Sequence, residues 1–90
     1  MPTSTAPDFD LIHDLAMRAD LEPETLTTDD WDAIYRIRYS HGSPGRIYYL
    51  CLHNCVAAHR CRLHGEMEAA RKLSDNAETY YRALPADWRW

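Results

Sequence analysis

The sequence predicts an all-α fold in which two short N-terminal helices pack on one long C-terminal helix. Apolar residues recur at helical spacing in three segments of the chain. Glycine occurs only 3 times in 90 residues, which disfavours a β-sandwich or barrel because those folds need many tight turns. No proline interrupts the chain between Pro44 and Pro85. We expect a flexible tail over residues 1–6 and one helical domain over residues 7–90, which a second copy of the chain could complete.

The first helix is expected over residues 7–20. Its apolar residues are spaced three and four apart, which places Ile12, Leu15 and Ala19 on one face. Thr5, followed three residues later by Asp8, resembles an N-terminal cap. Pro23 prevents the helix from continuing, because proline lacks the backbone N–H that a helix interior needs.

The second helix is expected over residues 28–40. Thr27 as N-cap places Asp30 at the third helical position, where its carboxylate completes a capping box. Gly42 can adopt the left-handed conformation that commonly ends a helix. The following helix can begin at Pro44, since proline is favoured in the first helical turn.

The third helix is expected to run unbroken over residues 44–84, roughly 60 Å if straight. A break near Gly65 is the alternative, and it would give two shorter antiparallel helices. The intact helix is the simpler prediction, because the apolar periodicity continues across Gly65. Steps of four and three residues trace this stripe through Leu52, Val56, His59, Leu63, Glu66, Ala70, Leu73, Ala77, Tyr80 and Leu84.

This stripe is longer than two short helices can cover, so we expect it to contact a second copy of the chain or another protein. The alternative is that the short helices and the aromatic C-terminus cover most of it. Its polar members, His59 and Glu66, would fix the register of the contact. The expected homodimer seam consists of Leu52, Val56, His59, Leu63, Glu66, Leu73 and Tyr80.

The formal net charge of −4 combines two regions of opposite sign. Residues 1–32 sum to −8 (nine acids, one base), and residues 33–90 sum to +4 (five acids, nine bases). Clustered carboxylates can imitate a phosphate strand in the basic groove of a nucleic-acid-handling protein, or they can pair with arginines of this chain. Direct nucleic-acid binding is not expected from an acidic chain. The candidate acidic contacts are Asp8, Asp10, Asp14, Asp29, Asp30 and Asp32.

Aromatic and arginine side chains form a second set of candidate contacts. Tyr, Trp and Arg are enriched among the residues that dominate the energetics of protein interfaces. Residues 85–90 either fold back onto the end of the long helix or present two indoles to a partner. The candidate contacts in this set are Tyr35, Arg38, Tyr39, Trp88 and Trp90.

Thiol and imidazole groups cluster between residues 51 and 64. Cys51, Cys55 and His59 lie one turn apart on one stripe and are the candidate zinc ligands. A single straight helix cannot enclose a tetrahedral ion, so further ligands would come from His13, His41 or a second subunit. We favour the interpretation that these cysteines are small core residues, and we expect no cofactor.

Together these features favour a non-enzymatic protein–protein interaction module, such as an inhibitor or modulator that docks on a larger complex. One form is an antidefence protein of a phage or mobile element, such as an anti-CRISPR protein. The alternatives are a small zinc-binding regulator and a helical enzyme subunit with His59 and Glu66 as an acid–base pair. No run approaches the roughly 20 apolar residues of a membrane span. The lack of a signal peptide and the odd number of cysteines favour a cytoplasmic location.

Overall fold

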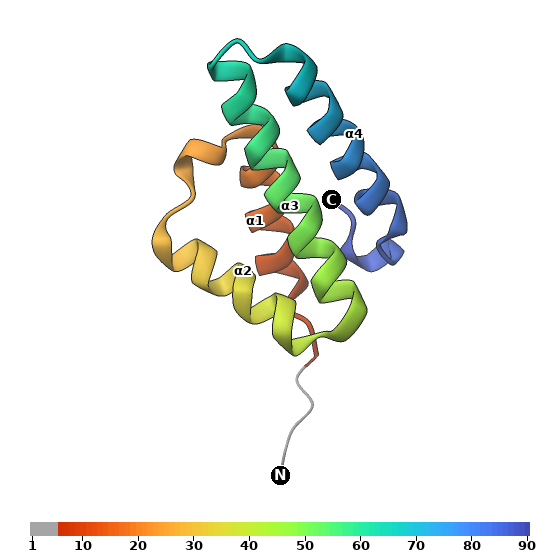
Figure 1. Ribbon diagram of the computed structural model, residues 1–90. Coiled ribbons are helices and arrows are strands. Elements are labelled where there is room, and N and C mark those ends of the chain that lie inside the picture. The colour runs from red at the N-terminus through yellow and green to blue at the C-terminus, as the bar shows by residue number, and fades with distance from the viewer. Residues whose placement is uncertain (1–5) are drawn as a thin grey trace.

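The computed structural model describes residues 6–90, which form an all-helical arrangement (Figure 1). This confirms the all-α part of the predicted fold class, and no strand occurs in that part of the chain. Residues 1–5 lie outside the described residues, and with them most of the predicted tail and the predicted cap at Thr5. The elements, in order, are α1 (Phe9–Leu21), the 3-10 turn η1 (Pro23–Thr25), α2 (Thr28–Ser40), α3 (Gly42–Leu63), α4 (Met67–Ala83) and the 3-10 turn η2 (Ala86–Trp88).

Helix α1 begins one residue after Asp8, whose carboxylate accepts a hydrogen bond of 3.1 Å from the backbone N–H of Leu11. Asp8 is therefore the N-cap itself, because its side chain satisfies an amide that has no partner within the helix. The helix ends at Leu21, and Pro23 opens η1, as the sequence predicts. The predicted apolar face is buried in the core.

Helix α2 has the bounds that the sequence predicts, and the predicted capping box is present. The Thr27 hydroxyl accepts from the Asp30 amide at 3.1 Å, and the Asp30 carboxylate accepts from the Thr27 amide at 2.8 Å. The helix ends at a sharp corner, where Gly42 has a φ of +62°. Beyond this corner a Cβ at Gly45 would clash with the carbonyl oxygen of Ile37, so glycine is what allows α2 and α3 to cross closely.

The prediction of one unbroken helix over residues 44–84 is wrong, because the chain reverses after Leu63. Gly65 has a φ of +75°, and its N–H donates to the Arg62 carbonyl at 3.1 Å. The Glu66 N–H donates to the Cys61 carbonyl at 2.8 Å, which completes a Schellman motif. Helix α4 then returns beside α3 (Figure 1). The apolar period did not reveal the turn because it keeps the same phase on both sides of Gly65.

The core lies among α1, α2 and α3 and is closed by residues from the end of the chain. Tyr48 is fully buried, and its hydroxyl donates to the Ile12 carbonyl at 2.7 Å. Trp88 is only 4% exposed and meets the rings of Phe9 and Tyr48 edge-on, with centroids 6.0 and 5.6 Å apart. Residues 85–90 therefore fold back onto the helices, and Trp88 is a core residue rather than the partner contact that the sequence suggested.

No helix within residues 6–90 combines the length and the apolar character needed to cross a membrane.

Candidate interaction surface and cavity

One side of the α2–α3 pair carries a continuous set of aromatic rings that encloses an arginine. We call this set the aromatic–guanidinium surface, and it consists of Trp31, Tyr35, Arg38 and Tyr39 of α2 with Tyr49 and His53 of α3. Trp31 and Tyr35 are four residues apart, Arg38 and Tyr39 follow Tyr35 by three and four residues, and Tyr49 and His53 are four apart, the spacings that place side chains on one helical face. The close crossing of α2 and α3 at Gly45 brings the two faces together.

The rings follow one another at contact distance across both helices. The centroids of Trp31 and Tyr35 are 6.4 Å apart, those of Tyr35 and Tyr49 are 5.5 Å apart, and those of Tyr49 and His53 are 5.8 Å apart with nearly parallel planes. These separations fall within the range in which aromatic pairs stabilise one another. The rings are therefore held in fixed orientations before any partner arrives.

Arg38 is held by rings instead of by a carboxylate. Its guanidinium carbon lies 4.4 Å from the Tyr49 centroid and 5.1 Å from the Tyr39 centroid, a cation–π arrangement. No ion pair of Arg38 occurs among the residues that the structure describes. Burial, followed by the neighbouring Tyr35 hydroxyl, raises the pKa of Tyr49. Within residues 6–90, the surface thus presents a positive charge that no carboxylate pairs with.

Two tyrosines of this surface are exposed to solvent. Tyr35 is 42% exposed and Tyr39 is 75% exposed. Of the aromatic contacts that the sequence suggested, Tyr35, Arg38 and Tyr39 are brought together here, whereas Trp88 and Trp90 are not. Sequence reasoning missed Tyr49 and His53, although their spacing of four residues within a predicted helix was a usable signal.

Three of the six predicted acidic contacts form hydrogen bonds or ion pairs within the fold. Asp8 caps α1, and Asp14 pairs with Arg18 at 3.3 Å. Asp30 belongs to the capping box and also lies 2.5 Å from Arg18, so the Arg18 hydrogen bond followed by the Thr27 amide lowers the pKa of Asp30. The other three are exposed and form no ion pair within residues 6–90: Asp10, Asp29 and Asp32.

The predicted dimer seam is divided by the turn at Gly65. Leu52 and Val56 lie in the core of a single chain, so they are not available to a second copy. His59, Leu73 and Tyr80 are half-buried, and Glu66 is exposed as the N-cap of α4. No hydrogen bond or ion pair joins His59 to Glu66 in the described part of the chain. Leu63, at 71%, is the most exposed apolar member of the former seam.

The three candidate zinc ligands differ in their burial. Cys51 is buried, whereas Cys55 and His59 are half-buried. Within the described residues, no three Cys, His, Asp or Glu side chains are grouped so that they could hold a metal ion. The two cysteines instead share a feature that the sequence did not indicate, a cavity of about 330 Å³.

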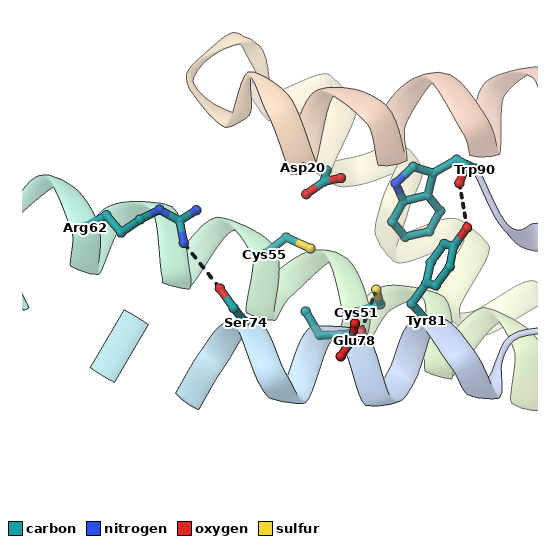
Figure 2. A pocket seen from close by; sticks show the side chains of 9 residues that line it. Asp20, Cys51, Cys55, Arg62, Ser74, Glu78, Tyr81 and Trp90 are labelled. Atoms are coloured by element: carbon teal, nitrogen blue, oxygen red, sulfur yellow. Dashed lines mark hydrogen bonds between the residues drawn. The ribbon is translucent and has the colours of Figure 1, made fainter. Parts of the chain in front are cut away.

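The cavity lies where α1, α3, α4 and the C-terminal residues meet (Figure 2). Cys51 and Cys55 form part of its wall on α3, and Tyr81 of α4 and Trp90 form its aromatic wall. The Tyr81 hydroxyl donates to the Trp90 carbonyl at 2.6 Å, and the two rings meet edge-on with centroids 4.8 Å apart. Trp90 is thereby fixed as a cavity wall, so the structure does not support its predicted role as a projecting partner contact.

Charged side chains from three helices line this cavity. Arg62 donates to the Ser74 hydroxyl at 3.2 Å and so links α3 to α4. Asp20 lines the cavity from the side of α1, as Figure 2 shows. Glu78 also lines the cavity and pairs with Arg82 at 3.4 Å. Sequence reasoning could not assemble this set, because it comes from three helices whose packing depends on the turn at Gly65.

The two thiols of the cavity differ in their environments. The Cys51 thiol lies 3.3 Å from the Ala77 carbonyl, to which it donates. Its hydrogen bonding with Cys55, followed by burial, raises the pKa of Cys51. The same hydrogen bond, assisted by Arg62, lowers the pKa of Cys55 against the opposing effects of burial and Asp20. Cys55 is therefore the more acidic of the two thiols.

Comparisons of this chain with family models, with curated proteins and with solved structures yield no match.

Proposed function

We propose that this protein is a non-enzymatic interaction module that binds another protein through the aromatic–guanidinium surface. The observation that carries the proposal is that an exposed side chain of this surface is packed against its neighbours. Tyr39 is 75% exposed, yet it packs against Arg38, which is itself stacked on Tyr49. Rigid aromatic and arginine side chains lose little conformational freedom on binding, which is why they dominate many interfaces.

The charge of Arg38 defines the chemistry of the proposed partner. A guanidinium without a carboxylate partner in residues 6–90 favours a partner surface that supplies one, since Arg forms bidentate pairs with carboxylates. The surrounding tyrosine rings would exclude water from that pair and so strengthen it. A protein patch with an acidic side chain beside apolar groups meets both requirements.

We further propose that the module acts as an inhibitor or modulator of a larger complex, and an antidefence role such as that of an anti-CRISPR protein is one form of this proposal. Its support is three of the predicted acidic contacts that are exposed and without ion pairs within residues 6–90, namely Asp10, Asp29 and Asp32. Such groups can meet a basic groove of a nucleic-acid-handling protein. Binding through them would weaken with added salt, because exposed charges are screened.

The expectation of a homodimer assumed an apolar stripe that one chain leaves uncovered. Helix α4 packs on α3 and covers part of that stripe. What supports a homodimer is confined to the end of the α3–α4 hairpin, where Leu63 is 71% exposed and Met67 is 60% exposed. Light scattering coupled to size-exclusion chromatography distinguishes a dimer from a monomer. A dimer that persists in a Leu63→Ala, Met67→Ala variant would contradict a contact at this end.

The test of the interaction surface is affinity capture from a host extract with two matched double variants. Arg38→Ala with Tyr39→Ala removes one charge and one exposed ring from the aromatic–guanidinium surface. Met67→Ala with Arg71→Ala removes one charge and one exposed apolar side chain from α4. We expect the first variant to lose the partner that the wild-type chain retains and the second to keep it. The reverse pattern would place the partner on α4 and overturn the proposal.

A further inference from the structure

The side of α3 that faces away from the aromatic–guanidinium surface carries the cavity with the paired thiols. Cys51 and Cys55 alternate with Tyr49 and His53 in the sequence, and residues two apart point to nearly opposite sides of a helix. We propose that this cavity binds a low-molecular-weight disulfide of the glutathione or cystine class and that Cys55 forms a mixed disulfide with it. The proposal does not depend on the proposed function, since the two sites share no side chain.

The size and the charges of the cavity suit this class of ligand. A cavity of about 330 Å³ lies at the lower end of the range of small-molecule sites. Glutathione and cystine carry both carboxylate and ammonium groups. Arg62 supplies a cation for the first, and Asp20 and Glu78 supply carboxylates for the second. The walls formed by Tyr81 and Trp90 cover the apolar part of the ligand.

Among the three cysteines, Cys55 is the one placed to react. Its sulfur points into the space between Asp20 and Tyr81 in Figure 2, and its side chain is half-buried. Cys51 is 1% exposed and donates to the Ala77 carbonyl, so an incoming disulfide cannot reach it. Cys61 is half-buried but does not line the cavity. Reactive cysteines are typically partly exposed thiols in an electropositive environment, and Arg62, which lines the same cavity, supplies the positive charge here.

The reaction is a thiol–disulfide exchange and needs no other oxidant. The Cys55 thiol loses its proton to solvent, and the thiolate attacks one sulfur of the bound disulfide. A new sulfur–sulfur bond forms as the original one breaks, and the other half of the ligand leaves as a thiolate. Cys55 is oxidised and the departing half is reduced. Cys51 is poorly placed to displace the bound half, because thiols one helical turn apart on an intact helix suit a disulfide poorly.

The first experiment compares the wild-type chain with Cys55→Ser and with Cys61→Ser as the matched control. Each reduced protein is incubated with oxidised glutathione, and adducts are followed by intact mass and peptide mapping. We expect one glutathione on Cys55 in the wild-type chain and in Cys61→Ser, and no rapid adduct in Cys55→Ser. Preferential modification of Cys61, or an internal Cys51–Cys55 disulfide in place of the adduct, would overturn the proposal.

The second experiment separates recognition by the cavity from simple thiol reactivity. Arg62→Ala should slow the reaction with oxidised glutathione by about fivefold, the upper range for an exposed ion pair. The same variant should slow the reaction with bis(2-hydroxyethyl) disulfide less, because that disulfide has no carboxylate. Arg71→Ala, on the adjoining helix, should change neither rate. Equal losses of Arg62→Ala with both disulfides would show that the cavity does not recognise the ligand's charge.

Discussion

The two sides of α3 present chemistry of opposite kinds. The side shared with α2 carries stacked rings and a half-buried arginine, with Tyr39 at 75% exposure. The side shared with α1 and α4 carries thiols in the wall of a cavity. The first presents exposed rings and suits a macromolecule, and the second is concave and suits a small molecule. One helix can therefore serve two kinds of ligand, provided that the core beneath it stays fixed.

Trp88 closes the core on which both sides of α3 rest, so its removal should have the largest effect. Trp88→Ala removes a buried ring that contacts Phe9 and Tyr48, and such truncations cost about 3–5 kcal/mol of the free energy of unfolding. Trp90→Ala, at the half-buried cavity wall, should cost clearly less. Urea denaturation followed by circular dichroism measures both, and similar losses in the two variants would show that Trp88 is not the common support.

Gly45 connects the aromatic–guanidinium surface to the fold, because it sets the distance between α2 and α3. The Cβ of Gly45→Ala would clash with the Ile37 carbonyl and would lie 3.2 Å from that of Arg38. We expect a loss of about 1–3 kcal/mol, as for overpacked sites. The control is Gly65→Ala, where a Cβ meets open space and only the φ of +75° is unfavourable, so a loss of about 1 kcal/mol is expected. A greater loss at Gly65 would contradict this order.

Acid should destabilise the α1–α2 contact specifically. The folded pKa of Asp30 is lowered from its ordinary value of 3.8, mainly by Arg18. The stabilisation is therefore present above pH 3.8 and is lost as the pH falls through the lower, folded pKa. Asp30→Asn should remove this part of the pH dependence and about 1 kcal/mol at neutral pH. Unfolding measured from pH 2 to pH 7 tests this, and Asp29→Asn, an exposed neighbour, should behave like the wild-type chain.

Tyr39→Ala should have the smallest effect on stability, within about 0.5 kcal/mol, because the ring is largely exposed. Its expected effect is on partner binding alone. A large loss of stability in this variant would show that the ring serves the fold, and the distinction between a binding side and a supporting core would then fail. Thermal unfolding of the same preparation used for affinity capture makes the comparison direct.

Local signals in the sequence located α1 and α2 well. Thr27 and Asp30 form a capping box whose two members are fixed by their spacing alone, and Pro23 and Gly42 punctuate the chain. The reversal after Leu63 was only the alternative prediction, because a glycine inside a heptad pattern is compatible with both a continuous helix and a hairpin. The choice depends on the tertiary contact of α4 with α3, which periodicity does not contain.

The candidate sites show the same division. Tyr35, Arg38 and Tyr39 belong to one helix, and their proximity follows from helical spacing. Their neighbours Tyr49 and His53 come from α3, and only the crossing at Gly45 brings them close. The cavity is even harder to predict from the sequence, because Asp20, Arg62 and Trp90 lie on three separate segments. The sequence left open whether residues 85–90 fold back or project, and the suggested contacts at Trp88 and Trp90 required them to project. The choice depends on the core, onto which these residues fold.

Asp30 couples the start of α2 to α1 through two hydrogen bonds. One carboxylate oxygen accepts from both the Thr27 amide and Arg18 of α1. The first turn of α2 therefore cannot fray without also releasing α1. Amide hydrogen exchange at the start of α2 should consequently report the opening of the α1–α2 pair as one cooperative unit and not the independent fraying expected of a helix end.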